Sequence, residues 1–494
     1  MAFDATFVQL PPSMIRLQTL PWTVHLVLNI GIFDRLQSSS CCTIIGNLHQ
    51  LGKLPHRFLR SLSERYGDLM LLHLGTKPIL VVSSANGAEE IMKTHDINFA
   101  NRPYSKIAAL VIYDGKDIAF GKYGEHWRKL KSICVLNMLS NKKVRSFRKI
   151  REEEVGLMVE SIQKSTPNSP LNLSNTFMKL ISDLVFRALF GKNCGEEYLG
   201  PLLKELSEAV GSFIFGDFIR WLGWIDEFSG VLSKGRKVAR SLDSLIQKRV
   251  EEHINGFDDD GRNQEDKIQY LVDVLLESQR NDSSIDMDTV KALLMDMITA
   301  GIETTATLLE WTMSELLMHP LVMKRLQKEL RGFLRGKTVI NEDDLKDMMY
   351  LKAVIKESLR LHPPLPFLLF RESSQDARVQ NYDIRLWNTS YHQRVGPTTT
   401  PDLLGRAEEL DERDFLTIRG MTLDSFRLEV EDEVATGLLS LMLKFELALA
   451  KSCRSLQLEV ADEVNVDSFM AESFGASLRR RDPFIAIPTP YSNY

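Results

Sequence analysis

Apolar residues recur at intervals of three and four along most of the chain between positions 56 and 361. In the runs 238–254 and 321–333 this spacing gives each predicted helix one apolar face and one polar face. A third run, 290–318, is apolar on nearly every side, which is typical of a helix buried within a core. The pattern therefore predicts a mainly helical protein.

A small β region is predicted near the start of this helical stretch. Residues 69–74 and 79–83 are rich in leucine, isoleucine and valine, and the sequence Gly75-Thr-Lys-Pro78 lies between them. Because glycine and proline favour turns, the two runs are expected to pair as a hairpin. The fold class that follows is mainly α with a small β region.

Length and composition agree with one large domain. The chain has 494 residues, of which 44% are hydrophobic and 26% charged, and these values place it within the globular range. No long linker rich in proline, glycine or serine separates positions 47 and 370. After about position 384 the helical and strand patterns blur, and acidic runs such as 429–433 lack an apolar face.

Charge and cysteine content exclude several classes of protein. The net charge is only −5 and the basic residues are spread through the chain, so nucleic-acid binding is not expected. The five cysteines are Cys41, Cys42, Cys134, Cys194 and Cys453. Their odd number and the lack of C-x-x-C spacing indicate neither a disulfide framework nor a zinc site. The domain is therefore expected to face a reducing compartment.

An apolar stretch at positions 20–33 is the candidate membrane segment. It is interrupted by His25 and Asn29, and it is shorter than the roughly 20 apolar residues that a spanning helix needs. It also lacks the cleavage pattern of a secretory signal. We interpret it as an interfacial segment or a damaged anchor.

The run Ala300-Gly-Ile-Glu-Thr-Thr305 lies inside the long apolar helix and carries candidate chemistry. A glycine within a helix costs about 1 kcal/mol relative to alanine, which is reasonable where a flat ligand or another backbone must come close. Glu303 and Thr304 would then place an acid and a hydroxyl beside that ligand. The alternative is a buried helix whose threonine bonds within the helix.

Two further motifs are informative only in combination. In Lys356-Glu-Ser-Leu-Arg-Leu-His-Pro-Pro364, Glu357 and Arg360 share one helix face and the prolines end the helix. Trp127 and Lys131 are four residues apart, so they also face the same way on a helix. Each pair by itself is typical of an ordinary surface contact.

In this order and at these separations, the motifs resemble those of the cytochrome P450 family, and most closely its plant microsomal type. The resemblance continues through Ile44-Ile-Gly-Asn-Leu-His-Gln50, Glu64-Arg-Tyr-Gly67, Phe99-Ala-Asn-Arg-Pro103, Tyr123-Gly-Glu-His-Trp-Arg128 and Arg371-Glu-Ser373, and it resumes in Ile485-Ala-Ile-Pro-Thr-Pro-Tyr491. It implies the cytochrome P450 fold.

By this resemblance, the run at 300–305 belongs to the oxygen-handling helix. Thr304 is similar to the residue that hydrogen-bonds iron-bound dioxygen, and Glu303 is similar to its acidic neighbour in proton delivery. Ala300 and Gly301 complete the catalytic run. The resemblance implies haem b and dioxygen as cofactors, with NADPH supplying electrons through a reductase.

The resemblance also implies residues that bind haem and substrate. Trp127 with Lys131, and Arg371, are similar to the partners of the two haem propionates, although arginine is usual where Lys131 stands. Glu357 and Arg360 are similar to a structural pair. The expected substrate pocket is apolar and comprises Leu365, Phe367, Leu368 and Leu369. Their alternative role is core packing.

Partners and location follow from the resemblance as well. We expect a flavoprotein cytochrome P450 reductase, an apolar small-molecule substrate, and the cytoplasmic face of the endoplasmic reticulum membrane. The family binds haem iron through a cysteine thiolate within F-x-x-G-x-R-x-C-x-G, and no such run occurs in this chain. Cys453 lacks the surrounding glycines and the preceding arginine, so no metal ligand is assigned. A P-E-R-F segment is also missing.

A shifted reading frame restores the missing motif. When the last base of each codon is read with the first two of the next, positions 420–435 permit H-D-F-G-F-V-P-F-G-G-G-R-R-G-C, with cysteine at the junction of Val434 and Ala435. Positions 412–415 permit E-R-F. The other shifted frame permits family-like segments at 385–396 and 36–43. We therefore interpret 1–43 as a degraded anchor and hinge, and 44–494 as a catalytic domain disrupted at 385–444.

The predicted activity is that of a haem-dependent monooxygenase that inserts one oxygen atom of O2 into an apolar small molecule. One alternative is an inactive remnant that binds no haem, because the thiolate ligand is absent from the chain as written. A second alternative, isomerase or dehydratase chemistry without dioxygen, is disfavoured by the intact run at 300–305.

Overall fold

The structure is a computed structural model that describes residues 45–165, 169–195, 199–256, 269–333, 340–380, 382–384, 394–397, 445–454, 456–460 and 469–490. Several sequence-based expectations concern residues outside these ranges. They are the anchor and hinge at 1–43, most of the disrupted segment at 385–444, and the hidden cysteine at Val434 and Ala435.

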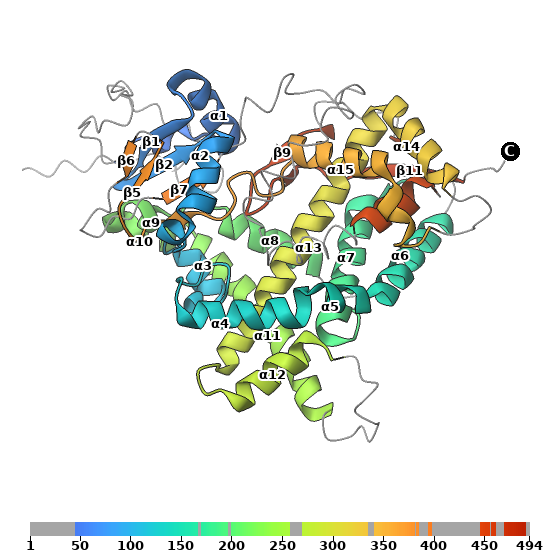
Figure 1. Cartoon of the computed structure of the whole chain (residues 1–494), viewed down its shortest axis with the longest axis horizontal. Helices are drawn as coiled ribbons and strands as arrows, with labels where there is room; N and C mark the ends of the chain where they lie inside the picture. The colour runs from blue at the N-terminus through green and yellow to red at the C-terminus, as the bar shows by residue number, and fades with distance from the viewer. Residues whose placement is uncertain are drawn as a thin grey trace, which may run out of the picture.

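Helices form most of the described chain (Figure 1). They are α1 (Pro55–Tyr66), α2 (Ala85–Glu89), α3 (Lys106–Val111), α4 (Glu125–Cys134), α5 (Asn141–Ser146), α6 (Arg148–Gln163), α7 (Leu173–Phe190), α8 (Leu199–Val210), α9 (Phe215–Phe218), α10 (Gly223–Phe228), α11 (Val231–Gly256), α12 (Leu271–Asn281), α13 (Met287–Met318), α14 (Pro320–Gly332) and α15 (Met349–Leu361). The predicted runs 238–254 and 321–333 are confirmed as helical in α11 and α14, although Phe333 itself follows the end of α14.

The long apolar run forms α13, which crosses the middle of the molecule (Figure 1). Asp286 caps it, because the Asp286 side chain accepts a hydrogen bond from the Thr289 backbone N–H at 2.9 Å. Helix α7 packs along α13. Of the helices in the described ranges, α13 alone has the length and hydropathy of a membrane span, but 72% of that apolar window is buried. It is therefore the central core helix.

The predicted hairpin is confirmed as β1 (Leu69–Leu74) and β2 (Lys77–Val82), with Leu69 opposite Val82. The turn requires glycine at position 75, where φ is +60°. A Cβ atom there would lie 2.7 Å from the Phe218 carbonyl oxygen. Strands β7 (Arg394–Pro397) and β4 (Arg371–Glu372) extend this sheet in the order β1-β2-β7-β4.

Smaller sheets complete the β region. Their strands are β3 (Leu171–Asn172), β5 (Ala377–Val379), β6 (Tyr382–Ile384), β8 (Leu456–Val460), β9 (Glu472–Ser473), β10 (Arg479–Arg480) and β11 (Ile485–Pro490). They pair as β3-β11-β8, β10-β9 and β5-β6. Strand β11 therefore brings the end of the described chain beside the start of α7.

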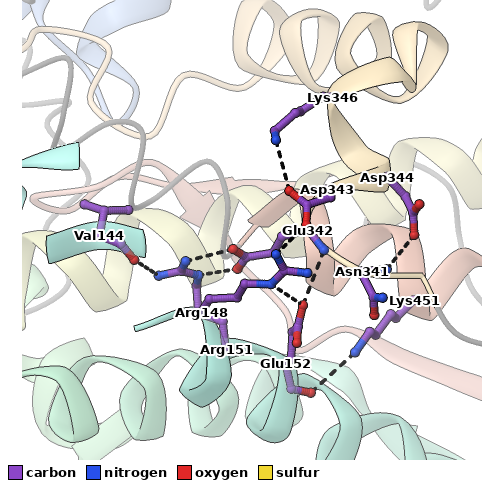
Figure 2. A network of polar contacts seen from close by, with 10 residues as sticks. All are labelled: Val144, Arg148, Arg151, Glu152, Asn341, Glu342, Asp343, Asp344, Lys346 and Lys451. Atoms are coloured by element: carbon purple, nitrogen blue, oxygen red, sulfur yellow. Dashed lines mark hydrogen bonds and ion pairs between the residues drawn. The ribbon is translucent and has the colours of Figure 1, made fainter. Parts of the chain in front are cut away.

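Residues 445–454 form a helix that belongs to the main core. Phe445 is 1% exposed and Cys453 is 1% exposed. Lys451 is buried too, and its Nζ donates to the Glu152 carbonyl oxygen at 3.4 Å (Figure 2). Residues 445–454 therefore belong to the folded core.

A polar network joins α6 to the turn before α15 (Figure 2). Arg151 forms a two-point ion pair with Glu342, in which its Nη2 donates to Oε2 at 2.9 Å, and both side chains are buried. Arg151 Nη1 also donates to the Val144 carbonyl oxygen at 2.7 Å. Because the buried charges are paired and hydrogen-bonded, the network fixes α6 against this turn.

Candidate functional site

The middle of α13 presents one open face on an otherwise buried helix. Ala300 is exposed and Thr304 is half-buried, whereas Ile302 and Thr305 are buried. Residues four apart share a helix face, so Ala300 and Thr304 lie one above the other. The Thr304 Oγ1 donates to the Ala300 carbonyl oxygen at 2.5 Å. The hydroxyl predicted for oxygen handling therefore lies on the accessible face and bonds within the helix.

Glu303 lies in a different environment from its neighbour Thr304. Its carboxyl is buried, and its Oε1 is 3.9 Å from Arg479 Nη1 of β10. Burial raises the pKa of Glu303, while the hydroxyls of Ser207 and Ser477 and the charge of Arg479 oppose that shift. Such a group can hold a proton nearer neutral pH than an exposed glutamate can, which suits the predicted proton-delivery role.

Gly301 faces a neighbouring helix. A Cβ atom at this position would be 3.4 Å from Val185 Cγ2 of α7. Of the two explanations that the sequence left open for this glycine, a flat ligand or a close helix, the structure shows a helix packed against it. Thr305 donates to the Gly301 carbonyl oxygen at 3.0 Å and points into the protein.

Trp127 and Lys131 share one face of α4, as their spacing predicts. The Lys131 Nζ lies 5.2 Å from the centre of the Trp127 ring. The Trp127 Nε1 donates to the Ile118 carbonyl oxygen at 2.9 Å. In this arrangement the indole N–H already has a protein acceptor, so a haem propionate would need either to displace Ile118 or to bind through Lys131.

Arg371 lies on β4 and has room for a further acceptor. Its Nη1 donates to Asp96 Oδ1 at 2.6 Å. Its Nε is buried without a hydrogen-bond partner in the part of the chain that the structure describes. A buried N–H of this kind is costly to leave unpaired, so an anionic group such as a propionate fits here.

Two of the four expected pocket residues line a small hollow. Leu368 and Leu369 form its wall together with Arg371 and Val82. Phe367 packs instead among aromatic rings, 5.8 Å from Phe474 between ring centres. The Leu365 carbonyl oxygen accepts the Leu368 N–H at 3.0 Å in the turn that precedes β4. The structure therefore brings Leu368 and Leu369 to one hollow and places Phe367 in core packing.

The pair Glu357 and Arg360 is buried, and so it is not the surface contact that its sequence spacing alone suggests. Arg360 donates through Nε and Nη2 to the two Glu357 carboxylate oxygens at 2.8 and 2.6 Å. The Glu357 side chain is 0% exposed and that of Arg360 is 11% exposed. Each charge therefore depends on the other for the stabilisation that water would give it at the surface.

A second buried cluster was missed by sequence reasoning. Glu315 of α13 bonds the His362 ring at 2.6 Å and lies 3.3 Å from His319. These two histidines lower the pKa of Glu315 to about 2, against the effect of burial. Trp311 stacks on His362 at 4.0 Å. Only the i, i+4 spacing of Glu315 and His319 gave any local signal.

The cysteines in the described ranges lie in the protein interior. Cys134, Cys194 and Cys453 are all buried. Burial raises the pKa of Cys134 and of Cys453 to about 12, so both thiols keep their protons at neutral pH. No group of three or more histidine, cysteine, aspartate or glutamate side chains suited to a metal occurs among the residues that the structure places. The propionate side of a haem site fits the chain, whereas these cysteines do not fit as iron ligands.

A family model gives the first comparison with known proteins. The model described as "Cytochrome P450" matches residues 37–386. Its upper limit coincides with the position at which the written sequence loses the expected pattern. The match includes α13 and its neighbours on both sides.

Curated relatives give the same family, and solved structures give the same fold. The chain is 40% identical over 464 residues to "Cytochrome P450 736A117" from Prunus mume, covering 91% of this chain and 89% of the relative. It is 40% identical to "Cytochrome P450 71A25" from Arabidopsis thaliana, covering 91% and 92%. A zebra fish cytochrome P450 solved with abiraterone superposes with a TM-score of 0.73 at 22% identity, covering 89% of this chain and 100% of that chain, which shows the shared fold.

Proposed function

We propose, since this chain belongs to the cytochrome P450 family, that its architecture serves a haem-dependent monooxygenase acting on an apolar small molecule. Members of the family are haem monooxygenases, and the open face of α13 at Ala300 and Thr304 is the observation that carries the proposal for this chain. We further propose that a flavoprotein reductase supplies the electrons, which it takes from NADPH. The substrate is proposed to contact Leu368 and Leu369.

The roles proposed for individual residues follow from their surroundings. Haem, when bound, would supply the activation of dioxygen. Thr304 would offer its hydroxyl on the open face, and Glu303 would hold a proton behind it. Arg371 would donate its free Nε–H to one propionate, and Lys131 would bind the other as a point charge.

The alternative function is an inactive remnant that binds no haem. The three buried cysteines favour it for the chain as written, because none of them lies in the ligand motif of the family. The end of the family match at residue 386 also favours it, since the expected ligand segment follows that point. Both functions share one fold and differ in one short segment.

A membrane surface and a reductase are the proposed partners. Trp221, Trp224 and Phe228 are exposed at 61%, 60% and 83% around α10, and a cluster of exposed aromatic rings suits the interface of the endoplasmic reticulum membrane. The reductase rests on the family alone. Lys129 of α4 is paired with Asp282 of this chain, and Arg148 of α6 is paired with Asp343.

Carbon monoxide spectroscopy tests the two functions against each other. Expressed with ample haem, the chain as written should not give the red-shifted reduced carbonyl spectrum of thiolate ligation, because none of its cysteines lies in the ligand motif of the family. A chain in which 420–435 carries the shifted-frame motif should give it. The matched control is Cys453→Ala in both chains. If the written chain gives the spectrum and Cys453→Ala abolishes it, Cys453 is the ligand and this account is wrong.

A further inference from the structure

Two aspartates face each other in the protein interior between α13 and the segment that precedes α4. Asp117 is 1% exposed and Asp296 is 5% exposed. The Asp296 carboxyl accepts the backbone N–H groups of Ile118 and Ala119, the two residues after Asp117, and the two carboxyl groups interact with each other. Neither residue belongs to the motifs that place the chain in its family.

Each carboxyl group has one oxygen bonded to backbone and one oxygen free. Asp296 Oδ2 accepts the Ile118 and Ala119 N–H groups at 2.8 and 3.3 Å, and Asp117 Oδ2 accepts the Phe120 N–H at 2.9 Å. The Oδ1 atoms of both aspartates are buried without a donor from the placed residues. Two carboxylates cannot both be ionised at this separation away from water, so a single proton between them satisfies both oxygens.

We propose that Asp117 and Asp296 share one proton, and that Asp296 is thereby a positioning residue for Trp127. Asp296 holds the Ile118 N–H, and the carbonyl oxygen of the same residue accepts the Trp127 indole N–H at 2.9 Å. Asp296 is also one helical turn before Ala300. The carboxyl pair therefore connects the open face of α13 to the aromatic ring of α4 through one backbone unit.

Among the ionisable groups that face each other here, the aspartate pair is the one that changes its charge with pH. Burial and the charge of Asp117 raise the pKa of Asp296 well above its usual range. From α4, Cys134 faces Asp296, and its thiol stays neutral because its pKa is raised to about 12. Lys116, next to Asp117, donates to Asp286 and Asp288 at the start of α13. When the shared proton leaves at high pH, the two carboxylates repel each other. The hydrogen bonds from the Ile118 and Ala119 N–H groups to Asp296 should then weaken.

Infrared spectroscopy tests for the shared proton without any need for haem. The full chain, made with aspartate labelled with ¹³C at the side-chain carboxyl, should show the carbonyl band of a protonated labelled acid at neutral pH. The band should disappear in Asp296→Asn and in Asp117→Asn. Asp226→Asn is the matched control, because Asp226 is also buried and accepts two backbone N–H groups, but its charged neighbour is Lys106. No labelled band at neutral pH, or one that survives in Asp296→Asn and Asp117→Asn, overturns the shared proton.

Hydrogen exchange tests the positioning role. After correction for intrinsic rates, a peptide covering 116–121 should exchange faster as pH rises in the native sequence. The reason is that the aspartate pair loses its proton and its hydrogen bonds to the backbone N–H groups of this peptide weaken. Asp296→Asn should keep the protection and remove the pH dependence, since the amide oxygen accepts the two N–H groups and its NH2 donates to Asp117. Asp296→Ala should lose protection at least tenfold at every pH.

The same variants separate positioning from general stability. A carboxyl whose folded pKa is raised stabilises the fold below its unfolded pKa, and this contribution is lost as pH rises through the folded pKa. The unfolding midpoint of Asp296→Asn should therefore depend less on pH than that of the native chain. If Asp296→Asn loses protection at 116–121 as fully as Asp296→Ala does, the positioning role is wrong.

Discussion

The buried pair of Glu357 and Arg360 shows how a residue's environment decides its energetic weight. An exposed pair at this spacing contributes little, because water screens both charges. Here both side chains are removed from solvent and bonded at two points. Loss of one partner would leave the other charge buried and unpaired.

We expect Glu357→Gln to lower the free energy of unfolding by about 3 to 5 kcal/mol, which is typical of breaking a buried ion pair. Urea denaturation followed by circular dichroism measures this change. The matched control is Glu227→Gln, which breaks an exposed two-point pair with Arg236. A Glu357→Gln variant as stable as this control would show that the buried pair contributes nothing to the fold.

Thr304→Ala should uncouple electron use from product formation. The reason is that the Thr304 hydroxyl lies on the open face of α13, where proton delivery is proposed. In a chain with the cysteine segment restored, peroxide release should rise at the expense of product at unchanged NADPH consumption. Thr305→Ala is the control, since Thr305 makes the same backbone bond but points into the core. Equal coupling in the two variants would contradict the role of Thr304.

At the scale of the element, helix 445–454 is the informative case. Phe445 is almost fully buried in the main core, although the sequence before it lacks any clear pattern. Phe445→Ala should therefore cost about 3 to 5 kcal/mol in the free energy of unfolding. Phe228→Ala removes the same ring from a site that is 83% exposed and should change that free energy little. Similar small effects in both variants would place 445–454 outside the folded core.

Local patterns predicted the elements better than the contacts between them. Periodicity was sufficient for α11, α13, α14 and the hairpin of β1 and β2, because each of these depends on neighbouring residues. The site depends instead on distant pairs. Glu315 meets His362 across 47 positions, and no spacing rule in the sequence relates such residues. Burial of Glu357 was unpredictable for the same reason, since it results from tertiary packing.

The same limit applies to the oxygen-handling helix. The cost of a glycine within a helix indicated that a flat ligand or another backbone approaches Gly301, and the atom found nearest to the position of its missing Cβ is the Val185 side-chain methyl group of α7. Which face of α13 is accessible could not be predicted, because the only charged residue between Ala300 and Thr305 is Glu303, and its carboxyl is buried. The accessible face became evident only from the burial of Ile302 and Thr305 beside the exposed Ala300.

At the scale of the whole molecule, the family model and the relatives cover different shares of the chain. The family model ends at residue 386, whereas relatives at about 40% identity cover about nine tenths of the chain. Core packing resumes at 445–454, and β11 follows at Ile485–Pro490. Gradual divergence would spread differences along the chain. Displaced reading frames, as the sequence hypothesis proposes, would instead confine the differences to one segment and leave family-like packing on both sides of it.

The transcript should therefore show small insertions, deletions or displaced exon joints near positions 36, 385, 404 and 444. In the frame that gives the haem-ligand motif, the bases across Val434 and Ala435 should read T-G-C. Sequencing the gene and its transcript measures this directly. Any other third base in the codon of Val434 means that the hidden cysteine does not exist, and the frame-shift hypothesis fails.

Two segments that flank positions 398–444 belong to the folded protein. Backbone pairing fixes β7 at 394–397 between β2 and β4, and helix 445–454 is packed in the core. Closing a longer or shorter connection between fixed ends changes the free energy only slowly, by about 0.6 kcal/mol for each doubling of its length. A protein engineer could therefore use 394–397 and 445–454 as defined junctions when splicing the equivalent of 398–444 from an active relative into this chain.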